Sequence, residues 1–195
     1  MISASQIYDF VHCPHRVYMD EFGDSDKRDE TSPFVELLWE QGLVHEGAVA
    51  AGLKITANLK SIGTADRERK TLSAMARREP LIYGGRLTTG DLVGEPDLLE
   101  WTDLGYVPGD IKSGSGFEGD ESEGKLKKQY AFQLAHYVAI LEQLVACPHF
   151  PHTNNTQLAA AAAVGKWETP WAFSKQAKPA SFPPLACAAN SAGVM

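Results

Sequence analysis

The fold is decided by the stretch Gly94-Glu95-Pro96-Asp97, followed thirteen residues after that aspartate by Asp110-Ile111-Lys112. Apolar residues around each acidic group predict two short strands, and residues 102–105 between them have the composition of a hairpin turn. Side chains two apart on a strand share a face, so Asp110 and Lys112 should point the same way, with Ile111 in the core. If the strands pair about the turn, Asp97 lies beside them.

Two carboxylates and one ammonium in this arrangement favour a hydrolytic metal site. Neighbouring carboxylates repel unless a hard cation lies between them, and Mg²⁺ prefers one or two carboxylates together with water and phosphate. A lysine beside the ion can orient or deprotonate the attacking water, or stabilise the charge that develops on phosphorus. We therefore expect Asp97, Asp110 and Lys112 to form one site.

The pattern Pro96-Asp97 followed by Asp110-Ile111-Lys112 resembles the signature of PD-(D/E)xK nucleases. The longer strings resemble the RecB-like branch of that superfamily, which includes the CRISPR-adaptation exonucleases. Three further segments agree in the expected order: an opening helix with a Cys13-Pro14 step, a helix over 37–46, and a helix that includes 129–137. The resemblance covers about residues 1–145 and implies a restriction-endonuclease-like α/β core, a mixed β-sheet flanked by helices.

The resemblance also implies roles for particular residues. His45, Asp97, Asp110 and the Ile111 carbonyl would hold Mg²⁺ or Mn²⁺. Lys112 would activate or position water, while Gln133 and Tyr137, four apart on one helical face, would contact the nucleic-acid backbone or brace the lysine. The reaction would be phosphodiester hydrolysis in DNA, as exonuclease or end-processing activity on single strands or ends. A helicase or a second nuclease domain would be a partner.

Several of these residues have an ordinary structural explanation as well. Asp97 and Asp110 could be turn or strand-end acids, and His45 could be a surface histidine. Glu46 is expected to point away from the site, since neighbouring helical positions do not share a face. Glu95 lies two residues before Asp97, and a solvated role is expected for it rather than direct ligation.

Length and composition limit the class of protein. At 195 residues the chain can bury one sizeable core, but a second full domain is not expected. No apolar run approaches twenty residues, and the N-terminus lacks the basic and apolar regions of a secretory signal. These features favour a cytoplasmic protein without a membrane partner.

The formal net charge of −7 is unusual for a nucleic-acid binder, which normally carries a basic surface. The charges are unevenly distributed, however. Residues 1–50 hold ten acids and three bases, residues 52–90 hold eight bases and three acids, and Lys125, Lys127 and Lys128 form a second basic cluster. A local basic groove is therefore compatible with the acidic total.

The remaining pattern predicts helices before and after the strands that carry the acids. The first helix should stop near Cys13-Pro14, residues 23–32 should form a loop, and Pro33 should open a helix to about residue 51. The segments expected next are a strand near 54–59, a helix near 65–78, strands near 80–83 and 87–88, a loop over 113–124, and a helix over 125–146.

Residues 146–195 differ in character from the domain assigned to residues 1–145. They contain one acid, a run of five alanines at 159–163 and several prolines. Such a segment buries little apolar surface, so we expect an irregular, poorly ordered Ala/Pro-rich tail. Proteins of the RecB-like branch continue with further strands, so the change in composition suggests a truncated or frame-altered C-terminus. An interrupted reading frame downstream would support that hypothesis.

The cysteines give an incomplete signal. Cys13, Cys147 and Cys187 form no CxxC pair, and three cysteines do not complete a four-thiolate site. Cys13 resembles the first ligand of the 4Fe-4S iron–sulfur cluster of several RecB-like nucleases, whose other ligands come from a C-terminal cysteine group that this chain lacks. An incomplete cluster site and a free thiol are both compatible with this pattern.

Two other functions fit part of the pattern. A nuclease-like core without its C-terminal strands could be a catalytically impaired DNA-binding or scaffold module, which the acidic charge and the tail favour. An enzyme acting on a small phosphoester fits the acids equally well but explains the helix of Gln133 less well. The complete set of His45, Asp97, Asp110 and Lys112 favours a metal-dependent deoxyribonuclease, since no structural role requires all four.

Overall fold

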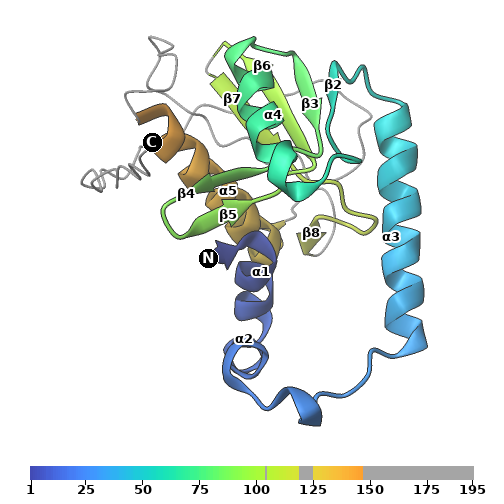
Figure 1. Cartoon of the computed structure of the whole chain (residues 1–195). Helices are drawn as coiled ribbons and strands as arrows, with labels where there is room; N and C mark the ends of the chain where they lie inside the picture. The colour runs from blue at the N-terminus through green and yellow to red at the C-terminus, as the bar shows by residue number, and fades with distance from the viewer. Residues whose placement is uncertain (104, 119–124, 147–195) are drawn as a thin grey trace.

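The computed structural model describes residues 1–103, 105–118 and 125–146. Figure 1 shows helix α5 crossing β4 and β5, helices α1 and α2 at the end of the molecule opposite the β6–β7 hairpin, and α3 along one side. The elements in chain order are β1 (Ile2–Ser3), α1 (Ala4–His12), α2 (Pro14–Phe22), a 3₁₀ turn (Ser25–Lys27), α3 (Pro33–Ala51), β2 (Ala57–Asn58), α4 (Thr64–Ala76), β3 (Leu81–Tyr83), β4 (Leu87–Thr89), β5 (Leu92–Gly94), β6 (Leu98–Thr102), β7 (Gly105–Gly109), β8 (Phe117–Glu118), β9 (Lys125–Leu126) and α5 (Lys128–Ala146). The predicted tail lies outside the described residues, apart from Ala146.

Two mixed sheets form the centre of the fold. The larger has the strand order β2-β3-β6-β7, in which β2 and β3 are parallel and the other pairs antiparallel. The smaller has the order β1-β5-β4, with β1 parallel and β4 antiparallel to β5. Strands β8 and β9 form a separate antiparallel pair. The predicted α/β class with mixed sheets and helices is confirmed, while the restriction-endonuclease-like core stays a prediction.

The predicted strand around the first acid is two strands in the structure. Strand β5 ends at Gly94 and β6 begins at Leu98, and the two belong to different sheets. Pro96 is fully buried between them and has no N–H to donate to a ladder, so a single strand cannot run through it. Asp97 therefore lies where the chain passes from one sheet to the other.

The predicted hairpin is confirmed. Strands β6 and β7 pair antiparallel along their whole length, with Leu98 opposite Gly109. Asp97 precedes Leu98 and Asp110 follows Gly109 in the chain. The register therefore brings the two aspartates to the same, open end of one ladder.

Helix boundaries follow local signals. Helix α1 begins after Ser3, whose side chain accepts the Gln6 N–H in a capping box, and it ends before Pro14 as predicted. Pro14 then begins α2, because proline is favoured in the first turn of a helix. This second helix was not predicted from the sequence. Helix α3 has the predicted bounds, with Pro33 directly after the Ser32 cap.

Other boundaries differ from the predictions. The strand expected near 54–59 is reduced to β2, and α5 begins at Lys128 because Leu126 still pairs with Phe117 of β8. A short 3₁₀ turn lies within the expected loop over 23–32. None of the helices in the described ranges is both long and apolar enough to span a membrane.

The main core packs the sheets against α4 and α5. Its fully buried members include Ile82, Leu99, Ile140 and Leu141. These residues come from β3, β6 and α5, so burial of apolar surface fixes the position of the α5 side chains relative to the hairpin. That relation places α5 beside the two aspartates.

Helix α3 is apolar but mostly exposed. Only Glu46 and Ala50, near its C-terminal end, are buried. Leu38, Trp39 and Leu43 are 53%, 60% and 63% exposed. The leucines before His45 therefore do not pack in the interior, because only the last turns of α3 reach the sheet.

Candidate functional site

Main-chain contacts fix Asp97 at the open end of the β6–β7 hairpin. Its carboxylate accepts the Ile111 N–H at 2.8 Å, and its carbonyl accepts the Gly84 N–H at 2.7 Å. Gly84 has a φ of +69°, and a Cβ there would lie 2.7 Å from the Cα of Lys60, so this close approach requires glycine. The backbones of two neighbouring segments therefore determine where the carboxylate lies.

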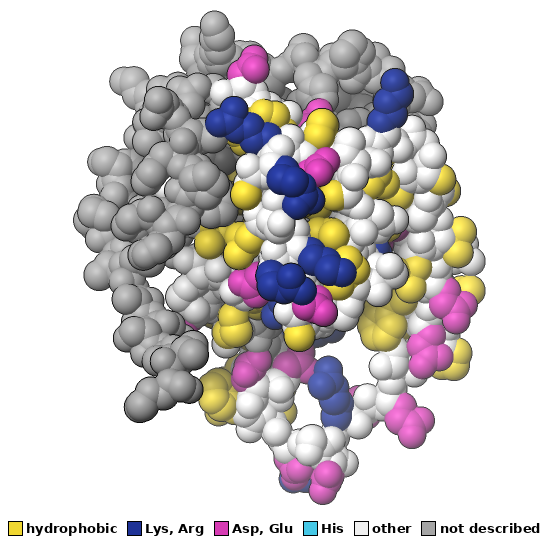
Figure 2. Space-filling model, turned by 45° about the horizontal axis from the view of Figure 1, so that its top comes forward, with side chains coloured by type: hydrophobic (Ala, Val, Ile, Leu, Met, Phe, Trp, Pro, Cys, Tyr) yellow, Lys and Arg dark blue, Asp and Glu magenta, His cyan; other side chains and the backbone are white. Residues whose placement is uncertain are grey.

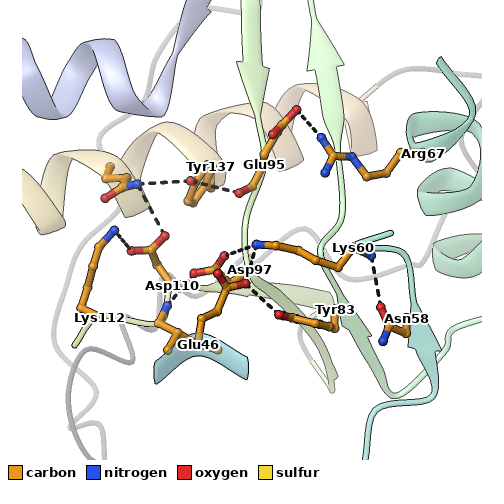
Figure 3. Close-up of polar contacts among 12 residues, drawn as sticks. Glu46, Asn58, Lys60, Arg67, Tyr83, Glu95, Asp97, Asp110, Lys112 and Tyr137 are labelled. Atoms are coloured by element: carbon orange, nitrogen blue, oxygen red, sulfur yellow. Dashed lines mark hydrogen bonds and ion pairs between the residues drawn. The ribbon is translucent and has the colours of Figure 1, made fainter. Parts of the chain in front are cut away.

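Lys112 and Gln133 contact opposite oxygens of the Asp110 carboxylate. The Lys112 ammonium lies 2.5 Å from Asp110 Oδ2, which confirms that the two side chains point the same way. Gln133 Nε2 donates weakly to Asp110 Oδ1 at 3.5 Å and to the Tyr137 hydroxyl at 3.4 Å. The Tyr137 hydroxyl in turn donates to the Glu95 carbonyl at 3.4 Å. These contacts, visible in Figure 3, join the hairpin to α5 and to the segment that follows β5.

A second group of polar side chains, which the sequence analysis missed, adjoins Asp97. The Lys60 ammonium contacts Glu46 Oε1 and lies 3.5 Å from Asp97 Oδ1. The Tyr83 hydroxyl donates to the same Glu46 oxygen at 2.9 Å. Figure 3 shows Lys60 reaching between the two carboxylates. Residues from α3, the segment after β2, and β3 therefore complete the site.

The structure corrects the expectation for Glu46 and separates it from His45. Glu46 was expected to point away, yet it is the α3 carboxylate that lines the pocket, whereas His45 is not among the lining residues. Adjacent helical positions lie on different faces, and the buried face of α3 is the one that carries Glu46 and Ala50. A metal-ligand role for His45 is a prediction that this placement does not favour.

Burial and neighbouring charges shift the pKa values of Asp97, Asp110 and Lys60. Burial, and then repulsion by Asp110, raises the pKa of Asp97 to about 7. Burial also raises the pKa of Asp110, although the Lys112 ammonium opposes that shift. Burial alone would lower the pKa of Lys60, but its contacts with Glu46 and Asp97 raise it. Such a set of buried acids gains stability from an additional cation.

The site opens into a pocket of about 730 Å³. Its polar lining includes Asp97, Asp110 and Lys112, and α5 contributes Gln133 and Tyr137. The α3 side contributes apolar lining as well, chiefly Leu38, Trp39 and Leu43. The pocket therefore combines a charged region with an aromatic and aliphatic wall.

Two arginines lie beside the acids on the side of the smaller sheet. The Glu95 carboxylate lies 2.7 Å from the Arg67 guanidinium and also contacts Arg86, which lines the pocket. Glu95 is thus held by cations, and its expected role outside direct metal ligation stays a prediction. A phosphate entering the pocket would compete with Glu95 for Arg86.

The donor set suits a hard divalent cation. Asp110 supplies a buried carboxylate and Asp97 one whose side chain is 15% exposed, and Gln133 Oε1 is a buried acceptor without a hydrogen-bond partner among the described residues. Within those residues, no three His, Cys, Asp or Glu side chains converge closely enough to enclose a metal by themselves. The arrangement therefore fits Mg²⁺ or Mn²⁺, which use few carboxylates and keep several waters, better than a caged structural metal.

The structure gives little support to an iron–sulfur site in the described part of the chain. Cys13 is exposed and free at the junction of α1 and α2. Cys147 and Cys187 lie outside the described residues. A cluster would need thiolates that residues 1–146 do not supply, since Cys13 is the one cysteine among them.

Comparisons with protein-family models, with curated proteins and with solved structures gave no match to this chain.

Proposed function

We propose that the chain is a Mg²⁺- or Mn²⁺-dependent deoxyribonuclease that hydrolyses phosphodiester bonds in single strands or at DNA ends. The observation that carries the proposal is the meeting of Asp97, Asp110, Lys112 and Gln133 in one pocket. Burying two acids that repel each other costs folding stability, so a purely structural role does not account for them. A helicase or a second nuclease domain stays a predicted partner.

Each residue of the pocket has a role in this proposal. Asp97 and Asp110 would hold the ion, with the Ile111 carbonyl as a further oxygen donor, and Glu46 would lie beside it across the Lys60 ammonium. Bound there, the ion supplies Lewis-acid polarisation of the phosphate and a more acidic water. Lys112 orients the attacking water and offsets negative charge on the phosphate oxygens.

Gln133 and Tyr137 position the catalytic groups and contact the DNA strand. Gln133 holds one oxygen of Asp110 while Lys112 holds the other, so the carboxylate cannot rotate freely. Gln133 Oε1, which has no hydrogen-bond partner in the part of the chain that the structure describes, is an acceptor for a water or for a substrate donor group. Tyr137 ties the pair to the backbone at Glu95.

The mixed lining of the pocket supports a nucleotide-containing substrate. Lys112 and Arg86 offer cationic groups to a phosphate, and Trp39 offers a face on which an unpaired base can stack. A small phosphoester without a base would leave the apolar wall in water. The wall therefore favours a nucleic-acid substrate over a small phosphoester.

A second candidate is a DNA-binding or scaffold module without catalysis. It is favoured by the ion pairs of Lys60 with Glu46 and Asp97, and of Lys112 with Asp110, which neutralise the acids without a metal. A module of this kind would bind nucleic acid in EDTA and would leave it intact when Mn²⁺ is added.

Digestion of end-labelled DNA separates the two candidates. Single- and double-stranded substrates are incubated with Mn²⁺, Mg²⁺ or EDTA, and wild type is compared with Lys112→Ala and with the exposed-lysine control Lys54→Ala. We expect metal-dependent cleavage that Lys112→Ala reduces by about 100-fold or more and Lys54→Ala leaves unchanged. Full activity in Lys112→Ala, with circular dichroism showing both variants folded, would refute the role assigned to Lys112.

A further inference from the structure

Lys60 belongs to none of the sequence motifs, yet its ammonium contacts the acid cluster formed by Glu46, Asp97 and Asp110. It contacts Glu46 from α3 and lies 3.5 Å from Asp97 Oδ1. The ring of Tyr83 lies 5.6 Å from the ammonium. A single cation of the protein therefore lies between Asp97, a proposed ligand of the metal, and the neighbouring carboxylate of Glu46.

The backbone of Lys60 is held firmly, so this contact follows from the fold. The Lys60 N–H donates to Asn58 Oδ1 at 3.1 Å, and the Lys60 Cα lies against Gly84, where a side chain would clash. Gly84 in turn donates its N–H to the Asp97 carbonyl. Contacts with Gly84 therefore fix the backbone of both Lys60 and Asp97.

The side chain of Lys60, by contrast, has room to leave. It is 39% exposed, while the side chains of Glu46 and Asp97 are 12% and 15% exposed. Its stem of four methylene groups is flexible, and the ammonium is well solvated when it is free. The ammonium can therefore move into water without any change in the backbone.

We propose that Lys60 is a displaceable internal cation that competes with the divalent metal for Asp97. In the metal-free protein its ammonium neutralises the two carboxylates and holds the end of α3 on the sheet. With a divalent ion held at Asp97, the Lys60 ammonium would be repelled and would move into water. Lys60 is thus a positioning residue that weakens metal binding, and the inference rests on the metal of the proposed function.

The test is Mn²⁺ binding to the metal-free protein in the absence of DNA, measured by titration calorimetry and by electron paramagnetic resonance of free Mn²⁺. Lys60→Met removes the charge and keeps much of the stem, Lys60→Arg keeps the charge, and Lys54→Met is the matched control. We expect Lys60→Met to lower the Kd by about tenfold or more, because one neighbouring positive charge is removed. The Lys60→Arg and Lys54→Met proteins should keep a Kd near that of wild type.

The outcomes separate this inference from the proposed function. If Lys60→Met binds Mn²⁺ no more tightly than wild type does, the proposed competition is refuted. The same holds if Lys60→Arg binds Mn²⁺ as tightly as Lys60→Met. Neither result contradicts the proposed nuclease activity. Absence of Mn²⁺ binding in every protein overturns both. If Lys60→Met does not fold, Lys60→Gln carries the same comparison, since its amide still donates to Glu46 without a charge.

Discussion

Asp97 carries a carboxylate that the fold buries beside a second carboxylate. Its raised pKa, about 7, means that the folded protein binds a proton more readily than the unfolded chain does. Above pH 7 both states are ionised and the folded state bears the full cost of the charge. As the pH falls toward 4, only the folded protein takes up the proton, and the cost disappears.

Asp97→Asn should therefore stabilise the metal-free protein at pH 8. The amide oxygen can still accept the Ile111 N–H, while repulsion of Asp110 is removed. We expect the free energy of unfolding in EDTA to rise by about 1–2 kcal/mol at pH 8, and the gain to vanish near pH 4. Urea unfolding at several pH values measures this.

The exposed Asp91→Asn is the control, which should change stability little at any pH. A less stable Asp97→Asn protein at pH 8 would mean that the ion pair with Lys60 outweighs the repulsion.

The residues of the site were predictable from sequence to different degrees. Asp110 and Lys112 are two apart next to a hairpin, and Gln133 and Tyr137 are four apart on a helix, so local periodicity places each pair on one face. Glu46 and Lys60 have no such local relation. Their contact depends on the angle at which α3 meets the sheet, and no spacing within the chain encodes that angle.

Helix α3 joins the acid cluster to an apolar surface. Its last turns supply Glu46, while the preceding turns supply Leu38, Trp39 and Leu43 to the same pocket. Exposed large side chains on a helix that borders a charged pocket are costly unless something covers them. In the proposed function, an unpaired base of the substrate covers Trp39.

Trp39→Ala should weaken DNA binding without changing the metal site. Stacking of one base contributes about 1–3 kcal/mol, so we expect affinity for a single-stranded oligonucleotide to fall by roughly 10-fold or more. Fluorescence anisotropy in EDTA measures the affinity without cleavage. Phe34→Ala, on the same helix but outside the pocket lining, is the matched control, and Trp39→Phe should retain most of the affinity. An equal loss in Phe34→Ala would point to a general effect on α3.

The elements themselves show where sequence patterns succeed and where they fail. The preferences of proline correctly located the end of α1 and the start of α3, because they act on the neighbouring backbone alone. The chain around Pro96 was misjudged as one strand, since apolar residues continue on both sides of it. Only pairing with different neighbours divides β5 from β6, and pairing is a long-range property.

The pocket draws on widely separated parts of the described chain. The smaller sheet, α1, α3, α5 and the residues that flank β6 and β7 all contribute to its lining. Figure 2 shows Lys and Arg side chains interspersed with Asp and Glu on one face, and pairs such as Arg69 with Asp66 and Arg77 with Glu79 neutralise part of the basic segment 52–90. In the proposed function, attraction of DNA over long distances would therefore be weak, and affinity would come from contacts inside the pocket.

A fragment that ends at Ala146 should retain the fold and the site. The main core, both sheets and the site residues lie within residues 1–146, and Ile140 and Leu141 near the end of α5 are fully buried. We expect the fragment to unfold in one cooperative thermal transition, at a temperature within about 5 °C of the full chain, because a loss of up to about 1 kcal/mol shifts Tm by a few degrees.

Calorimetry of the fragment and the full chain, each with and without Mn²⁺, checks this prediction. Because a bound ion stabilises the folded state in proportion to RT ln(1 + [L]/Kd), the same Mn²⁺-induced rise in Tm in both proteins would show that the site is intact without residues 147–195. A fragment that is unfolded, or one that folds but no longer responds to Mn²⁺, would instead show that the segment after α5 completes the core or the site. The matching control is a fragment ending at residue 138, which lacks Ile140 and Leu141 and should not fold, since it removes two fully buried side chains.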